Sequence, residues 1–260
     1  MTSANGGPEA IAEQLVAARV AGRILTEFPG PAPASLTDAY AIQDAYIEAM
    51  DEPLVGWKVG ATNAAAQANF GTEEPFFGPL FAATSSSSPA RPDLPAEAAR
   101  VIEPEFAFRI GEDLPGSGRA YTAADLENAV TSLHPAIEVV DLRIPRDPMP
   151  PIGIIVADGG GNGWFVYGDA HEDWSAEALP DHAVSVSANG EVRGDGTGAA
   201  ALGNPVNVLV WLANRLIEHG HHLRAGDWVS TGVCTPVFPA APGDQVIADF
   251  GSLGPVEVDF

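Results

Sequence analysis

The stretch Val101-Ile102-Glu103-Pro104-Glu105-Phe106-Ala107-Phe108-Arg109-Ile110 places two carboxylates in a run that is otherwise typical of a buried strand. Strand side chains alternate between two faces, so Glu103 and Glu105 are expected to project from the same side. Two carboxylates on one buried face repel each other and are costly to desolvate unless a cation compensates them. Their oxygen ligands favour Mg²⁺, Mn²⁺ or Ca²⁺ over zinc.

A plainer interpretation of this stretch stays open. Proline is tolerated at a sheet edge or a bulge, so Pro104 is also compatible with an edge strand whose two glutamates are solvated. Farther along, Ala136–Asp141 has the composition of a second buried strand, and it carries Glu138 among aliphatic residues.

Lys58 lies between Trp57 and Val59 in a short predicted strand, Leu54–Gly60. Lysine is rarely buried, so the local pattern alone favours a surface position on an edge strand. If the side chain is buried instead, desolvation is expected to lower its pKa towards values that suit proton transfer.

The composition excludes several classes of protein. The 260 residues, 46% hydrophobic and 18% charged, indicate a globular chain. The net charge of −23 repels phosphate backbones, so we expect no nucleic-acid partner. No run approaches ~18 apolar residues and no export signal is evident, so we expect no membrane partner and a cytoplasmic location. The single Cys234 excludes an intrachain disulfide.

The chain divides into an N-terminal helical segment, residues 1–52, and a core, residues 53–260. Apolar spacing predicts helices over 9–25, from about Ser35 to Met50, over 64–70, over 122–133 with a stop at His134-Pro135, and over 207–219. Residues 74–81 are expected to form an aromatic-rich loop, and 158–163 a glycine-rich loop. Further strands are expected over 164–167, in a hairpin around Asn189-Gly190, and over 227–231, 245–250 and 256–260.

Taken together, these motifs resemble the hydratase/decarboxylase family of meta-cleavage pathways, which includes 2-hydroxypenta-2,4-dienoate hydratase and 4-oxalocrotonate decarboxylase and belongs to the fumarylacetoacetate hydrolase superfamily. The matching motifs, in order, are Gly56-Trp57-Lys58-Val59-Gly60-Ala61-Thr62, Glu74-Pro75 with Gly78, Glu103-x-Glu105, Pro135–Asp141 with Arg143-Ile144, Gly198-Ala199-Ala200, Trp211–Asn214, Ala225-Gly226-Asp227 and Ser230–Thr235. The resemblance implies an α+β fold, with N-terminal helices followed by a mixed β-barrel-like or roll-like catalytic core with peripheral helices.

The resemblance also implies a site. Glu103, Glu105 and Glu138 are then ligands of Mg²⁺ or Mn²⁺, and Lys58 is a buried acid/base rather than a surface residue. Thr235 is expected to help hold the substrate carboxylate, by family analogy alone.

Two departures from the family pattern fall where substrate choice is set. Phe76 stands where family members commonly have an aspartate, and an aromatic ring cannot transfer protons. The family's Asp-Asn-Ala-Ser-Ser loop is here Asp158-Gly159-Gly160-Gly161-Asn162, so Asn162 becomes a candidate substrate contact.

The leading hypothesis is a metal-dependent lyase of aromatic-compound catabolism that hydrates a 2-hydroxyalka-2,4-dienoate to a 4-hydroxy-2-oxo acid. The alternatives are decarboxylation of a 4-oxalocrotonate-type 2-oxo-3-enedioate, C–C hydrolysis of an acylpyruvate-type substrate, and a non-catalytic partner role. Hydrolysis needs a water-activating His or Glu, and no histidine precedes His134. We expect a small anionic 2-oxo or 2-hydroxy acid as substrate, a homo-oligomer, and association with a related pathway enzyme.

Overall fold

Two long antiparallel strands, β4 (Val101–Ile110) and β5 (Val130–Val140), form the centre of the fold. The computed structural model, which describes residues 6–260, pairs them with Glu103 opposite Glu138. Ile102, Phe106 and Phe108 project from the other face of β4 and are buried in the main hydrophobic core. The alternation of β4 therefore separates a core face from a face that carries both glutamates.

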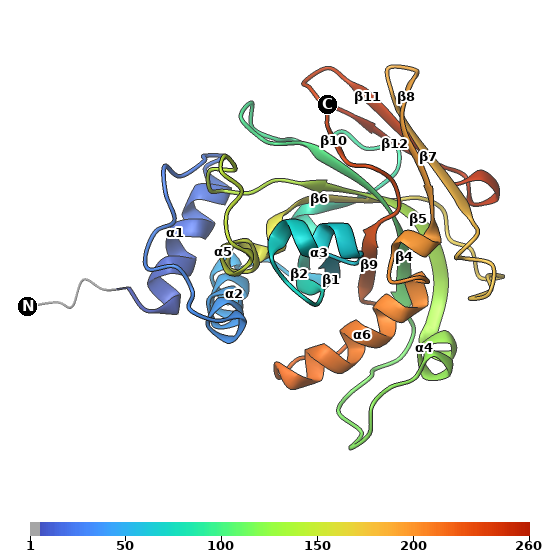
Figure 1. Cartoon of the computed structure of the whole chain (residues 1–260), viewed down its shortest axis with the longest axis horizontal. Helices are drawn as coiled ribbons and strands as arrows, with labels where there is room; N and C mark the ends of the chain where they lie inside the picture. The colour runs from blue at the N-terminus through green and yellow to red at the C-terminus, as the bar shows by residue number, and fades with distance from the viewer. Residues whose placement is uncertain (1–5) are drawn as a thin grey trace, which may run out of the picture.

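These strands belong to a mixed eight-stranded sheet with the order β2-β1-β9-β4-β5-β6-β3, in which β10 also pairs with β4. The strands are β1 (Leu54–Gly60), β2 (Phe76–Phe81), β3 (Ser85–Ser87), β6 (Asn162–Tyr167), β9 (Trp228–Val233) and β10 (Phe238–Pro239). β1 pairs in parallel with β9, and β3 with β6, whereas the remaining pairs are antiparallel. The sheet curls into a half-barrel around the face of β4 and β5 that carries the glutamates (Figure 1).

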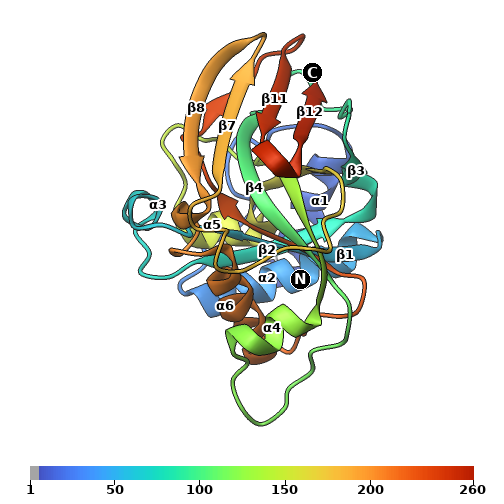
Figure 2. The same cartoon turned by 90° about the vertical axis from the view of Figure 1, so that its right-hand side faces the viewer.

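A second sheet of four antiparallel strands has the order β12-β11-β7-β8. Its strands are β7 (Ala183–Ala188), β8 (Glu191–Thr197), β11 (Gln245–Asp249) and β12 (Pro255–Asp259). Figures 1 and 2 show this sheet at the end of the molecule remote from the N-terminal helices. Its strand β12 contacts β5 and β6 of the larger sheet.

The helices are α1 (Pro8–Val20), α2 (Leu36–Met50), α3 (Ala64–Phe70), α4 (Ala123–Ala129), α5 (Ile152–Ala157) and α6 (Pro205–Glu218). Their ends follow from capping. Ser35 accepts a hydrogen bond from the backbone N–H of Asp38 at the start of α2, and Thr122 and Asp125 form a capping box at the start of α4. None of the helices in residues 6–260 is long and apolar enough to cross a membrane.

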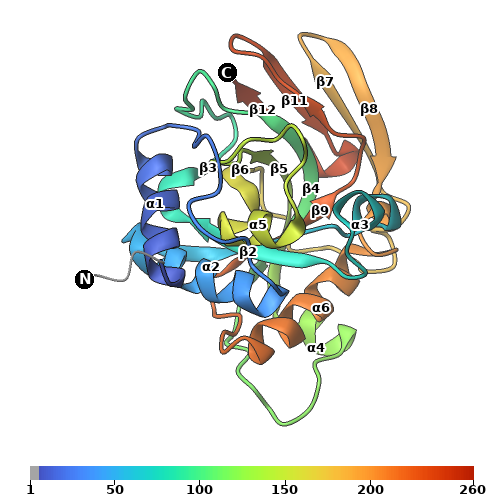
Figure 3. The same ribbon diagram turned by 60° about the vertical axis from the view of Figure 1, so that its left-hand side comes forward.

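The N-terminal helices are bonded to the core that follows them. Gln43 of α2 donates to the carbonyls of Phe77 (3.1 Å) and Val156 (2.8 Å), and Arg19 of α1 donates to the carbonyl of Asp141 (3.0 Å). Figure 3 shows α1, α2 and α5 gathered on one side of the larger sheet. A division at residue 52 remains a prediction, because α1 and α2 bury their apolar faces in the main core.

The α+β fold with N-terminal helices is confirmed, but three of the predicted elements are wrong in part. Residues 76–81 form β2 rather than a loop, and the outermost position of β2 tolerates Pro79. The helix that starts at Thr122 ends at Ala129. The strand β5 then begins at Val130 and runs through His134-Pro135, because pairing with β4 outweighs the proline signal. The first helix ends at Val20 rather than residue 25.

Candidate active site

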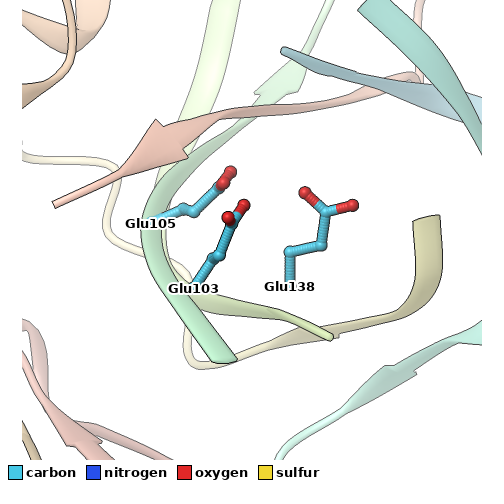
Figure 4. A group of neighbouring side chains, drawn as sticks. All are labelled: Glu103, Glu105 and Glu138. Carbon is cyan, nitrogen blue, oxygen red and sulfur yellow. The ribbon is translucent and has the colours of Figure 1, made fainter. Parts of the chain in front are cut away.

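Three carboxylates converge on the inner face of the half-barrel. Glu103 and Glu105 project from β4 and Glu138 from β5, and each offers an oxygen within 4.8 Å of the others (Figure 4). Glu103 and Glu138 face each other in the antiparallel register, and Glu105 lies two residues farther along the same face. The backbone hydrogen bonds of one hairpin therefore place all three carboxylates.

Neighbouring donors fix two of these carboxylates. Glu105 Oε2 accepts hydrogen bonds from the Ser230 hydroxyl and from the Gly232 N–H (2.9 Å), both on β9. Glu138 Oε1 accepts one from Asn162 Nδ2 (2.9 Å), and Lys58 Nζ lies 3.2 Å from Glu138 Oε2. These contacts leave the other oxygen of Glu105 without a hydrogen-bond donor among the described residues.

This arrangement fits a hard divalent cation. A buried carboxylate oxygen with no donor is costly, and a cluster of carboxylate oxygens is the donor set that Mg²⁺ and Mn²⁺ prefer. Among residues 6–260, these glutamates are the only group of three or more acidic, histidine or cysteine residues with such spacing.

Burial and mutual repulsion raise the pKa values of two carboxyl groups in the cluster. Burial raises the pKa of Glu103 to about 7, the charge of Glu138 adds to the rise, and Lys58 opposes it. Burial, followed by the charges of Glu138 and Glu103, raises the pKa of Glu105 well above its ordinary range. A cation bound between the carboxylates would relieve both effects.

Lys58 is buried, with 2% of its surface exposed, so the surface position that the local pattern favoured is not what the structure shows. The expected lowering of its pKa is also wrong in this setting. Burial lowers the pKa, but the charges of Glu138, Glu103 and Glu105 outweigh burial and raise it. The ammonium group is therefore held protonated by the same carboxylates that would hold the cation.

A glycine turn lies against the stem of Lys58. Gly160 has a φ of +68°, and a Cβ built there would lie 3.1 Å from the Cα of Gly78 and 3.6 Å from the Cε of Lys58. Only glycine combines this backbone conformation with so close an approach to β2. The turn therefore packs against both β2 and the lysine side chain.

A cavity of about 180 Å³ opens beside the carboxylates, and both Glu103 and Lys58 line it. Most of the other walls are apolar, and they come from β1, α3, β2, β4, the segment 140–155, β9 and the segment after β9. Phe76 is one of them, 3% exposed, with its ring centroid 5.3 Å from Lys58 Nζ. An engineered cavity of 150 Å³ holds benzene, so this volume suits a small organic acid.

The structure separates the other predicted substrate residues from this cavity. Asn162 contacts Glu138 instead of lining the cavity, and the Thr235 hydroxyl donates to the carbonyl of Pro236 (3.2 Å). Thr62, Asn63 and Arg146 line the cavity although the sequence did not single them out for this role. The only available signal for Arg146 was a basic residue in a proline-rich loop of an acidic chain.

The sequence profile described as fumarylacetoacetate (FAA) hydrolase C-terminal matches residues 42–260. The chain belongs to the fumarylacetoacetate hydrolase family. Within this family it is 34% identical over 254 residues to 2-keto-4-pentenoate hydratase of Burkholderia vietnamiensis, covering 96% of each chain. It is 33% identical over 243 residues to 2-hydroxyhexa-2,4-dienoate hydratase of Comamonas testosteroni, covering 87% of this chain and 90% of that one.

Among fumarylacetoacetate hydrolase folds of known structure, 4-oxalocrotonate decarboxylase from Pseudomonas putida G7, complexed with magnesium and adipate, superposes with a TM-score of 0.84 at 30% identity. The match covers 97% of both chains. The resemblance to the hydratase/decarboxylase group is thus confirmed, and the protein is an enzyme of that group.

Proposed function

We propose that this enzyme is a divalent-metal-dependent lyase that adds water to a 2-hydroxyalka-2,4-dienoate and yields a 4-hydroxy-2-oxo acid. The observation that carries the proposal is the convergence of Glu103, Glu105 and Glu138 beside Lys58, with Glu103 and Lys58 lining one cavity. The hydratases that are 33–34% identical to this chain support the choice of water addition.

Glu103, Glu105 and Glu138 would hold Mg²⁺ or Mn²⁺ with their facing oxygens. When bound, such a cation polarises the 2-oxo or 2-hydroxy group and offsets the charge of a developing enolate, which is worth several kcal/mol. It also supplies positive charge to an anionic substrate, which the net charge of −23 would otherwise repel.

Lys58 is the proton carrier that the geometry offers. Its ammonium group lies in the cavity beside Glu138, where it can give a proton to a substrate carbon during ketonisation and take one back. A positioned acid/base of this kind typically contributes about 10²–10⁴-fold to the rate. Phe76 and the other apolar walls limit the water around this group, which strengthens its electrostatic interactions.

Phe76 also supports a second candidate, decarboxylation of a 2-oxo-3-enedioate. That reaction shares the enolate but needs no attacking water, and the apolar ring of Phe76 stands where a proton-transferring acid was expected. The structural similarity to 4-oxalocrotonate decarboxylase is compatible with this candidate. Roles for Thr235 and Asn162 in binding substrate remain predictions, as does a homo-oligomeric assembly.

One experiment separates the candidates. Purified protein with Mg²⁺ or Mn²⁺ is offered 2-hydroxypentadienoate and 4-oxalocrotonate, while dienoate absorbance and CO₂ are followed. Loss of absorbance without CO₂ supports hydration, and CO₂ release supports decarboxylation. Cleavage of an acylpyruvate, with neither of the other substrates consumed, would show that the proposal is wrong.

A further inference from the structure

Two cationic side chains line the cavity, and they differ in whether a carboxylate pairs with them. Lys58 is committed to Glu138 at 3.2 Å and is fully enclosed. Arg146 lines the same cavity but forms no ion pair with any carboxylate of residues 6–260. In a chain with 35 acidic and 12 basic residues, an arginine that is left without a carboxylate partner beside a cavity is available to a ligand.

The loop that carries Arg146 is anchored rather than free. On its N-terminal side, Arg143 pairs with Asp141 and donates its backbone N–H to Asp158 (2.5 Å), and the Arg143 carbonyl accepts from Leu25 (2.7 Å). The loop then continues with prolines at 145, 148, 150 and 151, each of which removes backbone freedom. The guanidinium group is therefore presented from a backbone with little entropy left to lose on binding.

The other walls of the cavity indicate what kind of ligand can reach Arg146. Phe70, Met149 and Val237 belong to the same cavity and offer hydrocarbon surface, not hydrogen-bond partners. A substrate whose first carboxylate lies at the glutamate cluster would extend its unsaturated chain along such walls. Because Lys58 is already paired with Glu138, Arg146 is the cationic lining residue that can pair with a negative group on that chain, and a planar guanidinium fork matches a carboxylate.

We propose that Arg146 determines specificity by binding a second carboxylate, so that the preferred substrate is a dianionic 2-hydroxydienoate or 2-oxo-enoate. The inference rests on the proposed function for the position of the first carboxylate. It concerns hydration, in which the far carboxylate keeps its bonds. In the decarboxylation of a 2-oxo-3-enedioate, that carboxylate would instead leave as CO₂.

A matched pair of substrates tests the proposal. 2-Hydroxyhexa-2,4-dienoate ends in a methyl group, and 2-hydroxyhexa-2,4-diene-1,6-dioate has a carboxylate in its place. The wild-type enzyme should prefer the dioate in kcat/KM for hydration, measured as turnover without CO₂ release, and Arg146→Gln should reduce that preference about 10- to 100-fold, the range of a charge-assisted hydrogen-bonded pair. The methyl-terminated substrate should be little affected. Arg146→Lys should restore part of the preference, because lysine keeps the charge without the fork.

Arg193→Gln is the control, because Arg193 is an exposed arginine of β8 that does not line the cavity. A wild-type preference for the methyl-terminated substrate, or an unchanged ratio in Arg146→Gln, would overturn the proposal. If neither dienoate is consumed, the proposed function has failed, and calorimetry with Mg²⁺ still decides the role of Arg146. Adipate should then bind more tightly than hexanoate to the wild type but not to Arg146→Gln, and equal discrimination by both proteins would refute the inference.

Discussion

Lys58 Nζ lies 3.2 Å from Glu138 Oε2, so the proposed proton carrier and a proposed metal ligand share one carboxylate. Glu138 also accepts a hydrogen bond from Asn162 through its other oxygen. A cation at the cluster would compete with the ammonium group for Glu138 Oε2. Metal binding and the proton affinity of Lys58 are therefore expected to be coupled. Removal of the metal should change the pKa of Lys58, and replacement of Lys58 should change the metal affinity.

Glu105→Gln should abolish metal binding and turnover together. The amide keeps the size of the side chain but loses the negative charge, and its NH₂ group cannot act as a metal ligand. Mg²⁺ affinity measured by calorimetry should fall by at least about 100-fold, since even loss of an outer partner costs 10–100-fold. Glu112→Gln, at an exposed loop position, is the control. Unchanged turnover in Glu105→Gln would mean that the metal centre is assigned wrongly.

Lys58→Met should separate chemistry from metal binding. The variant keeps the length of the side chain but removes the proton, so kcat should fall about 10²–10⁴-fold. Mg²⁺ affinity should be kept or should rise, because a competing positive charge has left the carboxylate cluster. A parallel loss of metal affinity and of kcat would instead assign the lysine a purely structural role.

Mg²⁺ binding should weaken as the pH falls through about 7. The pKa of Glu103 is raised to about 7 in the protein without a cation, so below that pH the carboxyl group is protonated and must lose its proton before it can bind. Calorimetry in buffers of different ionisation enthalpy should detect proton release near pH 6 and little release near pH 8.5. The effect on folding has the same origin. Because this pKa lies above its unfolded value, the metal-free protein should lose stability as the pH rises from about 4.5 to 7. An Mg²⁺ affinity that does not change between pH 6 and 8 would contradict this prediction.

Phe76→Asp should shift the reaction towards water addition at a cost in stability. The aspartate would place a proton-transferring group within reach of Lys58, and the ratio of hydrated product to CO₂ should rise for a substrate able to give both. Loss of the buried ring should lower the free energy of unfolding by about 3–5 kcal/mol. Phe76→Asn creates the same space without an acid and is the matched control. Equal product ratios in the two variants would show that the acid has no role at this position.

Gly160→Ala should perturb Lys58 through the backbone. Its φ is +68°, and the new methyl group would press on Gly78 and meet the lysine stem, so both stability and kcat should fall. Gly118→Ala isolates the backbone cost, because Gly118 has a φ of +77° with nothing within 4 Å of its Cβ position. That control should lose about 1–2 kcal/mol of stability and no activity. Equal effects on kcat in both variants would argue against a positioning role for the turn.

The sequence predicted the local part of the site better than the long-range part. Glu103 and Glu105 follow from the two-residue period of a strand, which needs no tertiary information. Glu138 lies opposite Glu103 only because β4 and β5 pair in one register, and no local pattern in the connection between them, which contains α4, specifies that register. Only the resemblance to a family predicted that Glu138 is the third acid of the site. The misassigned start of β5 has the same cause, since residues 130–135 become a strand by pairing with β4.

Arg146 and Phe76 are residues whose place in the site could not be predicted from local sequence patterns. Arg146 follows a buried salt bridge in an irregular loop, where neither periodicity nor a motif indicates that it lines the same cavity as Glu103. Phe76 was noticed as a departure, but its contact with Lys58 depends on the pairing of β1 with β2, which the expected loop did not include. Cavity walls assembled from several connections are the least predictable part of such a site.

The three acids belong to a single pair of strands, whereas many of the cavity walls come from other segments, among them α3, β2 and the proline-rich loop. The residues that would bind the metal and many of the residues that would select the substrate therefore lie in different segments of the chain. Substitutions in the loop can exchange one substrate tail for another without disturbing the ladder that orients the carboxylates. This separation provides a physical route by which one scaffold can diversify into several enzymes while the reaction core stays constant.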